Sequence, residues 1–418
     1  MAFPDRRAVR AATLGAGIAA GVLAVTLAAC SGSDGTTAQA TAEASPTPSP
    51  QTSASPTSSL GMEQLVASKL TVADGTEAGP AAGRSLNLPS GWKAEVWANV
   101  PGARMAVWTP DDRLIVSTGD DGTLSLLTPT SDGRAPRVTK LADNLENPQG
   151  VAMTEDDGRE VLVLGETTRI VAWDYHNGRL TRRRVVVDGL PSGGHGAKMV
   201  AVRNGVVYYN VGSRTNRDPS DRTSKPVRAT IEQIGLDGTG HRIIATGVRN
   251  GEGLSFAPDG TLFSAINQGD NQPYPFDDDQ GKRGSDVRSY VNEHPNDQIS
   301  RITTGLDLGW PLCVPDSRGH EDLTNLPYVN DPVNNPDGDH LDCGSLQPTM
   351  LGLPAHSAPV GFVFTQGSAL PENLGDGALI TAHGSWNRQP PRPPFWQIAH
   401  FPSSSSRPAH AAGLHIFL

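Results

Sequence analysis

Acidic residues are missing from the end of this chain of 418 residues: none of its 44 Asp and Glu lies in residues 377–418. Aromatic residues are few, at 5%, and no stretch other than 11–29 is apolar for as long as a membrane span requires. The net charge is −10 and no basic stripe stands out, so a nucleic-acid partner is not expected. The 46 Gly and 34 Pro favour turns and short strands over long helices.

The first 30 residues have the pattern of an export signal. Three Arg residues precede the charge-free run 11–29, which ends in Leu-Ala-Ala before Cys30 and resembles a bacterial lipobox. We expect residues 1–29 to be a lipoprotein signal peptide and Cys30 to be lipidated, which would anchor the protein on the extracytoplasmic side of the cell membrane. An ordinary signal peptide with an incidental Cys is one alternative, and the pair Arg6-Arg7 leaves twin-arginine export open.

The segment after Cys30 cannot form a core. Eighteen of residues 31–60 are Ser, Thr or Pro, and none is Lys or Arg. Such composition buries too little apolar surface to offset chain entropy, so we expect 30–84 to be a disordered tether.

Two cysteines remain beyond the lipobox. In an exported protein, Cys313 and Cys343 are expected to form a disulfide that closes a Pro-, Asp- and Asn-rich insertion. Metal binding is the weaker alternative, because no Cys-x-x-Cys motif or nearby pair of His supports it.

Short β-type runs recur after tight turn signals. The second residues of these turns lie at positions 112, 158, 205, 260 and 377. Successive turns are therefore separated by 46, 47, 55 and 117 residues. Each turn is followed by a strand-like run: 114–117, 161–164, 206–209, 262–265 and 379–382. A recurrence near 47 residues with several strands per unit predicts an all-β propeller. A β-sandwich or a series of unrelated hairpins is the alternative.

Unusual polar residues fall beside these runs. His195 is flanked by glycines in a loop, where an imidazole is not a packed core residue and has the pKa for general-base work. Arg249-Asn250 lies at another junction between strand and loop, and can donate to a bound ring or form only a surface ion pair. Gln149 and the segment 267–270 occupy similar places in other repeats. Such groups would converge on the mouth of a propeller channel.

Taken in order, these segments resemble the glucose/sorbosone dehydrogenase family, six-bladed propellers that use pyrroloquinoline quinone (PQQ) with Ca²⁺. The resemblance covers roughly residues 85–390 and rests on five segments: Gly189–His195, Gly247–Asn250, Gly309–Pro311, His356–Gly361 and His383–Arg388. The last two are similar to the sorbosone-type branch of the soluble aldose sugar dehydrogenases.

The resemblance implies an oxidoreductase that oxidises a sugar, either an aldose or a sorbosone-like aldehyde, by hydride transfer to PQQ. His195 would be the general base, and Arg249 would hydrogen-bond the quinone oxygen where negative charge develops. The implied cofactor-binding residues are Gln149, Arg249, Asn250, His356 and His383.

Calcium is the second implied cofactor. The backbone carbonyls of Gly269 and Asp270 are its candidate ligands by match, since Ca²⁺ prefers oxygen ligands. The run Asp277–Asp279 is expected to be a solvated loop instead. One departure from the family concerns Gly194, because some relatives have an acidic residue directly before the base. Any group that orients His195 must therefore come from elsewhere in the chain.

Two other functions remain open on the sequence alone. A propeller that only binds glycans or proteins would need neither His195 nor Arg249. A lactonase-type hydrolase would need carboxylates or Asn around a central metal, and these are not evident. For the dehydrogenase, the partners would be a sugar and an unidentified electron acceptor.

The acid-free end of the chain bears on the last repeat. One further period of about 47 residues after Gly377 would pass Leu418, so we expect an incomplete last blade. The segment 391–418 departs from the family pattern, and we interpret it as a frameshifted or otherwise aberrant tail, which would weaken cofactor binding and activity. Resequencing the gene tests this hypothesis.

Overall fold

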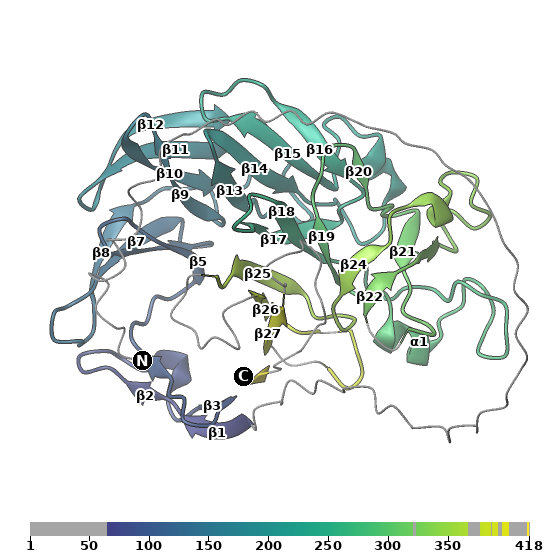
Figure 1. Ribbon diagram of the computed structural model, residues 1–418, viewed down its shortest axis with the longest axis horizontal. Coiled ribbons are helices and arrows are strands. Elements are labelled where there is room, and N and C mark those ends of the chain that lie inside the picture. Colours follow the sequence, from purple (N-terminus) through teal and green to yellow (C-terminus); the bar gives the residue numbers. More distant parts are fainter. Residues whose placement is uncertain are drawn as a thin grey trace, which may run out of the picture. The chain divides into compact units, whose positions relative to one another are not determined.

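Propeller-like sheets dominate the computed structural model, which describes residues 65–320, 323–366, 377–385, 387–391, 395–400 and 416–417 (Figure 1). The predicted signal peptide 1–29, Cys30 and the tether up to residue 64 lie outside the described residues. So does most of the segment 391–418.

The described residues form five sheets of four or five strands. The first two sheets contain β5 (Ala103–Trp108), β6 (Leu114–Thr118), β7 (Thr123–Thr128) and β8 (Arg137–Ala142), then β9 (Val151–Asp156), β10 (Arg159–Gly165), β11 (Ile170–His176) and β12 (Arg179–Val187). The third contains β13 (Val200–Arg203), β14 (Val206–Val211), β15 (Thr230–Gly235), β16 (Arg242–Thr246) and β20 (Leu306–Asp307). The fourth contains β17 (Asn250–Phe256), β18 (Leu262–Asn267), β19 (Gln298–Arg301), β24 (Thr349–Gly352) and β22 (Thr324–Leu326). The fifth contains β25 (Pro359–Phe364), β26 (Gly377–Ala382), β27 (Phe395–His400) and β28 (Ile416–Phe417).

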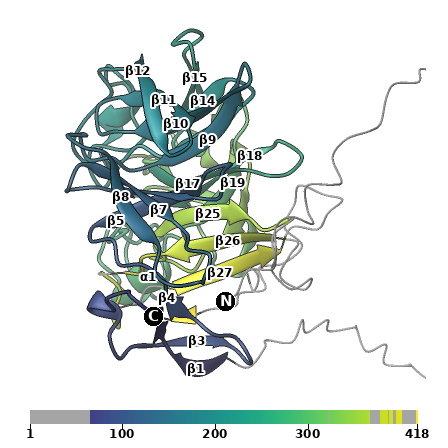
Figure 2. The same cartoon turned by 90° about the vertical axis from the view of Figure 1, so that its left-hand side faces the viewer.

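The sheets follow one another around a common centre. Their first strands contact in chain order: β5 with β9, β9 with β13, β13 with β17, and β17 with β25. Figures 1 and 2 show the sheets side by side. Their strand pairs are antiparallel except for β16 with the edge strand β20, and in the fourth sheet β22 lies outside β24. The all-β, propeller-like prediction is confirmed, while six blades stay a prediction.

The predicted repeats coincide with these sheets. Each predicted run is the second strand of a sheet, namely β6, β10, β14, β18 and β26. The turns before four of them have the left-handed backbone that the turn residues predicted, with φ of 59° at Asp112, 71° at Gly158, 72° at Gly205 and 88° at Gly260. Local turn chemistry therefore sets the register of each hairpin.

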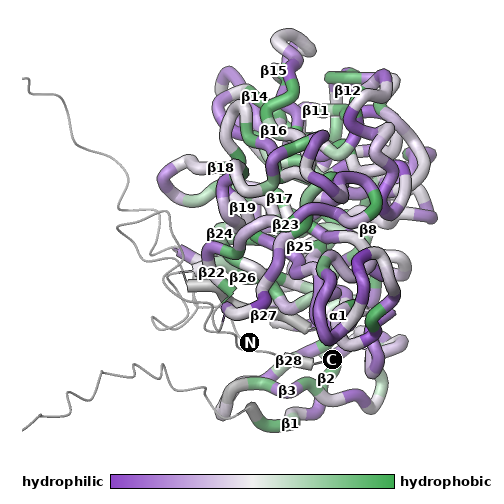
Figure 3. The backbone as a smooth tube through the Cα atoms, turned by 90° about the vertical axis from the view of Figure 1, so that its right-hand side faces the viewer, coloured by the Kyte–Doolittle hydropathy of each residue, from purple (hydrophilic) through white to green (hydrophobic). Residues whose placement is uncertain are grey.

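The core lies between neighbouring sheets. Val163 of the second sheet and Tyr209 of the third are fully buried in one cluster, and Leu124 of the first packs with Leu164 of the second in another. Figure 3 shows hydrophobic stretches alternating with hydrophilic ones along the backbone. Burying each such side chain contributes about 1.5–3 kcal/mol, so contact between the sheets, not any one sheet alone, stabilises the ring.

Helices are scarce, as expected. The only α-helix in the described residues is α1 (Arg288–Glu293), and 3-10 turns occur at η2 (Gly79–Ala81), η3 (Pro219–Arg222) and η4 (Cys343–Ser345). No helix within the described ranges is long and apolar enough to cross a membrane.

The insertion between β20 and β24 carries the predicted disulfide. Cys313 begins β21 (Cys313–Pro315), which pairs with β23 (Tyr328–Asn330), and its sulfur is bonded to that of Cys343. Both cysteines are buried with Leu312 and Tyr328. The pairing is confirmed, and the metal alternative is wrong for these two residues.

Replacing both cysteines by serine is expected to lower the free energy of unfolding by about 2–4 kcal/mol, because the unfolded chain regains the entropy of a loop of some 30 residues. Chemical unfolding of the oxidised wild type and the double variant measures the difference. The reduced wild type should match the variant. An unchanged unfolding midpoint would contradict this expectation.

The structure corrects the N-terminal boundary of the propeller domain. We predicted a tether up to residue 84, but β1 (Leu65–Lys69) pairs with β3 (Ser85–Pro89), and β2 (Thr71–Val72) pairs with β4 (Glu95–Val96). The ordered part therefore begins before residue 85. The sequence concealed this because the two short strands carry little apolar alternation.

The expected incomplete last blade is also corrected. β27 pairs with β26 over six residue pairs, and β28 pairs with β27, so the fifth sheet has four strands. Counting a full period after Gly377 was misleading, because the third strand needs only the segment 395–400. The frameshift hypothesis for the tail stays a prediction.

Candidate functional site

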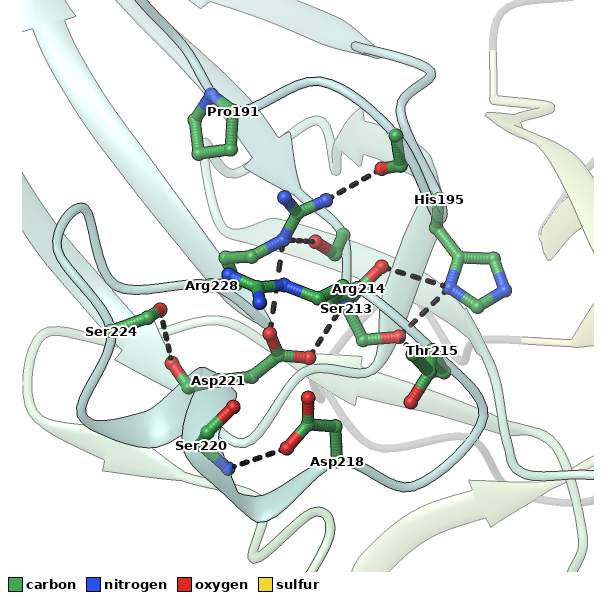
Figure 4. Close-up of polar contacts among 12 residues, drawn as sticks. Pro191, His195, Ser213, Arg214, Thr215, Asp218, Ser220, Asp221, Ser224 and Arg228 are labelled. Atoms are coloured by element: carbon green, nitrogen blue, oxygen red, sulfur yellow. Dashed lines mark hydrogen bonds and ion pairs between the residues drawn. The ribbon is translucent and has the colours of Figure 1, made fainter.

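His195 lies in the loop between β12 and β13, against the segment that follows β14. Its Nδ1 is 2.8 Å from Ser213 Oγ and 3.2 Å from Ser213 O (Figure 4). A carbonyl oxygen can only accept, so Nδ1 carries the proton. The hydroxyl of Ser213 donates in turn to Thr215 O at 2.8 Å and therefore accepts from Nδ1. In the neutral imidazole, Nε2 is thus the nitrogen with the free lone pair.

Two buried cations fix the loop that carries His195. Arg228 donates to the carbonyls of Ser192 at 3.0 Å and Gly193 at 2.6 Å, and its charge lies 3.9 Å from the buried carboxylate of Asp221. Lys198 is fully buried and donates to the carbonyls of Pro191 and Gly196. These bonds restrain the backbone of the loop, because breaking them would leave buried charged donors without partners.

The environment of His195 disfavours its charged form. Burial is the main cause, and the charges of Arg249 and Arg228 add to it, so the pKa of His195 falls to about 4. The imidazole is therefore neutral at pH 7 and can accept a proton at Nε2.

We expect His195 to titrate near pH 4 instead of near its ordinary value of about 6.5. Between these two values the unfolded chain binds the proton and the folded chain does not, so the stability that this group contributes is lost as the pH falls. An NMR titration of the imidazole carbons checks the midpoint, and the spectrum of H195Q assigns the resonance. A midpoint above pH 6 would contradict the expectation.

Arg249 is buried directly before β17, in the segment that connects it to β16, and Asn216 holds its side chain. Its Nε and Nη2 donate to the backbone and side-chain oxygens of Asn216 at 3.2 and 3.1 Å. Asp270 Oδ2 lies 3.7 Å from Nη2, and Asp270 Oδ1 lies 3.8 Å from Nδ1 of His356. The backbone carbonyl of Arg249 accepts from Ser213 N at 2.8 Å, which links Arg249 to the residue that orients His195.

The other predicted cofactor residues occupy different surroundings. Gln149 is buried, donates to Asn147 and accepts from Arg104. His356 is buried and donates from Nε2 to Val291 O. It interacts with the carboxylates of Asp270 and Asp297, both of which also interact with Arg249. His383 is exposed, and its backbone N–H is bonded to Ala358 O. Their cofactor roles stay predictions.

Beside His195 lies a cavity of about 370 Å³. Its lining residues come from three loops and one strand: Asn147, Thr167, Gly193, Gly194, His195, Gly196, Ala197 and Glu252. Sequence reasoning missed Glu252 of β17, whose carboxyl faces the same space as His195. The only available signal was its position two residues after Asn250 in the Arg-Asn segment. Ser213, Arg228 and Lys198 were missed as well, because only the tertiary contacts reveal them.

Observations on the described residues fit a flat, anionic cofactor near Arg249. Among these residues no acceptor is bonded to Arg249 Nη1, and the buried Oδ1 of Asn250 and both amide atoms of Gln268 have no hydrogen-bond partner. Gly212 packs directly against the loop of His195, since a Cβ there would lie 2.4 Å from His195 O. The oxygens of a quinone with carboxylates would accept hydrogen bonds from Arg249 Nη1 and Gln268 Nε2.

The predicted calcium ligands fit poorly. The carbonyl of Asp270 accepts from Asn216 Nδ2 at 2.7 Å, and its carboxylate lies between Arg249 and His356. Within the described ranges, no group of three or more His, Cys, Asp or Glu could hold a metal ion. These residues therefore do not form the cage of six or more oxygen ligands that Ca²⁺ requires. The run 277–279 is exposed, as expected.

Comparison with known proteins assigns the family. The model of the TrAA12-like family matches residues 86–411. The chain belongs to the TrAA12-like family. The match continues beyond residue 390 into the segment that we predicted to be an aberrant tail, which argues against a foreign sequence up to residue 411. The sorbosone-type branch stays a prediction.

The relatives include characterised and uncharacterised proteins. This TrAA12-like chain is 26% identical over 251 residues to the pyrroloquinoline quinone-dependent pyranose dehydrogenase of Coprinopsis cinerea, covering 53% of this chain and 32% of that one. It is 27% identical over 201 residues to an uncharacterized protein of Borreliella burgdorferi, covering 47% and 44%. The chain thus spans less than half the length of these curated relatives.

Solved structures support the fold. The holo form of the PQQ domain of the Coprinopsis cinerea pyranose dehydrogenase has a TM-score of 0.68 at 20% identity, covering 82% of this chain and 87% of that one. The calcium structure of the Trichoderma reesei family AA12 enzyme has a TM-score of 0.62 at 19% identity, covering 77% and 84%. At these identities the likeness establishes the fold only.

Proposed function

We propose that this TrAA12-like chain is a PQQ-dependent dehydrogenase that oxidises a sugar. The observation that carries the proposal is His195, which lines a cavity, has a neutral imidazole with its proton held on Nδ1, and is linked through Ser213 to the buried Arg249. A scaffold that only binds would have no use for such a fixed base. The PQQ-dependent relative and the family assignment support the same reading.

The residues of the chain divide the chemistry between them. PQQ, when bound, supplies an acceptor for the hydride that leaves the substrate carbon. His195 Nε2 accepts the proton of the substrate hydroxyl, while Ser213 keeps the ring in the tautomer that can do so. Arg249 Nη1 would donate to the quinone oxygen, and the polar atoms of Asn250 and Gln268 would bind the remainder of the cofactor.

The finer assignments are part of this proposal. The substrate is an aldose or a sorbosone-like aldehyde, and an unidentified acceptor removes the electrons. Lipidation of Cys30 would hold the domain at the extracytoplasmic face of the membrane. Although the Trichoderma reesei relative has a calcium structure, no group of three or more His, Cys, Asp or Glu among the described residues of this chain could hold a metal ion, and we derive no step from calcium.

Titration of the purified full chain with PQQ tests the proposed function. At about 100 times the dissociation constant, PQQ should stabilise the fold by about 2.7 kcal/mol, seen as a rise in Tm. Aldoses with a dye acceptor should then show PQQ-dependent turnover. R249Q should lose most of the rise in Tm. Absence of both the rise and the turnover in the wild type would overturn the proposal.

A further inference from the structure

Glu252 lies where β17 departs from regular pairing with β18. The register of the two strands shifts between Asn250 and Gly253, so Gly251 and Glu252 occupy a β-bulge. The glycines on both sides are tightly packed: a Cβ on Gly251 would lie 2.7 Å from Ser264 Oγ, and one on Gly253 would lie 2.8 Å from Ala265 Cβ. A bulge re-aims the side chain that it carries, and here that side chain is Glu252.

The carboxyl of Glu252 and the loop of His195 line the same cavity of about 370 Å³. The two residues come from different sheets, Glu252 from β17 and His195 from the loop before β13. A molecule that fills this space would therefore contact both, and the volume suits a monosaccharide-sized ligand.

The carboxyl of the part-buried Glu252 has few partners within the protein. Oε1 accepts from Asn250 Nδ2 at 3.1 Å, and no Lys, Arg or His nitrogen of the described residues lies within ion-pairing distance. Burial raises the pKa of Glu252, and the more distant charges of Arg104, His383 and Arg249 offset this only in part. A part-buried carboxyl that lines a cavity and has no ion pair has hydrogen-bonding capacity that the protein leaves unused.

We propose that Glu252 is a substrate-binding residue that holds one hydroxyl group of a neutral, polyhydroxylated substrate and so positions a second hydroxyl at His195. A carboxyl group can both donate to and accept from a hydroxyl, and Asn147 and Thr167 add further polar groups to the same wall. This inference rests on the proposed function for the identity of the reacting group at His195.

Sugar binding to E252A, E252Q and the wild type tests the inference. Saturation-transfer NMR with D-glucose, D-galactose, D-mannose and D-xylose gives dissociation constants with no need for turnover. We expect E252A to bind the best of these sugars about tenfold more weakly, and E252Q to recover most of the loss because its amide also donates and accepts. The matched control is E160Q, which makes the same change at a part-buried glutamate outside the cavity.

Monodeoxy derivatives of that sugar separate binding from a structural role. One derivative should bind the wild type about tenfold more weakly, yet lose nothing further in E252A, since the deleted hydroxyl is the one that Glu252 holds. Where the enzyme turns over, E252A should raise KM and leave kcat within about threefold.

The inference would be overturned if the wild type bound no sugar, or if E252A bound the sugar as tightly as the wild type. It would also be overturned if E160Q lost as much sugar affinity as E252A, or if every deoxy sugar lost as much further affinity in E252A as it does in the wild type. Failure of the proposed function looks different. In that case the wild type would bind the sugar in the Glu252-dependent manner, but would show no PQQ-dependent turnover.

Discussion

H195A is expected to lower the kcat of the PQQ-loaded enzyme by a factor of about 10²–10⁴, the range that a positioned general base contributes. Ser213 fixes the proton of His195 on Nδ1, and burial keeps the ring neutral with its pKa at about 4. Alanine removes the imidazole of His195, which lies beside the cavity and has a free lone pair on Nε2. Steady-state kinetics with a dye acceptor measures the effect.

The loss should be confined to catalysis. Arg228 and Lys198 fix this loop through hydrogen bonds to its backbone carbonyls, and these bonds do not depend on the His195 side chain. H195A should therefore keep the Tm and the PQQ affinity of the wild type. H176A, a change at an exposed histidine of β11, should have full activity. Wild-type turnover in H195A would show that another group takes the proton. For the wild type, kcat/KM should rise through an acid limb near pH 4 and then stay level to neutral pH.

G194A is expected to disrupt the same site from the other side of the loop. Gly194 has φ of +58°, and a Cβ there would lie 2.2 Å from Arg214 O and 2.5 Å from Ser213 O. Since no flexible side-chain end can move away, the backbone at Ser213 must shift, and the bond that orients His195 is lost. We expect a loss of about 2–4 kcal/mol in unfolding free energy and at least a tenfold fall in kcat.

G193A is the matched control for this change. Gly193 also has a positive φ, of +72°, but an added Cβ would meet nothing within 4 Å. G193A should therefore lower the free energy of unfolding only by the cost of placing an alanine in the left-handed backbone region, about 1 kcal/mol. Urea unfolding and steady-state kinetics of the two variants separate the cost of the left-handed backbone, which both share, from the steric clash with Ser213 and Arg214, which only G194A has. Equal effects of G193A and G194A would contradict the close approach to Ser213.

The same geometry explains the departure that the sequence showed at this position. Some relatives have an acidic residue directly before the base, and Gly194 stands there in this chain. The structure leaves no room for a side chain at 194 and supplies a neutral partner, Ser213, in its place. A neutral partner does not stabilise the imidazolium as a carboxylate would, which agrees with the low pKa of His195.

Local patterns predicted the parts of the fold that depend on near neighbours. Turn residues such as Asp112 and Gly205 require left-handed backbone whatever surrounds them, so the hairpins and the second strand of each sheet could be located in advance. The disulfide followed from counting cysteines in a chain that we expect to be exported. Where the pattern was weak, as at β1 and β27, the prediction was wrong, because pairing with β3 and β26 decides those strands.

The sequence by itself determined an all-β chain of repeated hairpins, the pairing of Cys313 with Cys343, and His195 and Arg249 as the residues to examine. Only the tertiary structure decided how these residues work. Ser213 orients His195, Asn216 and Asp270 hold Arg249, and a bulge turns Glu252 toward the cavity. The physical reason is the separation along the chain of the groups that interact. Turn and strand preferences act between neighbours in the chain, whereas tautomer, burial and cavity lining depend on groups that meet only when the sheets pack together.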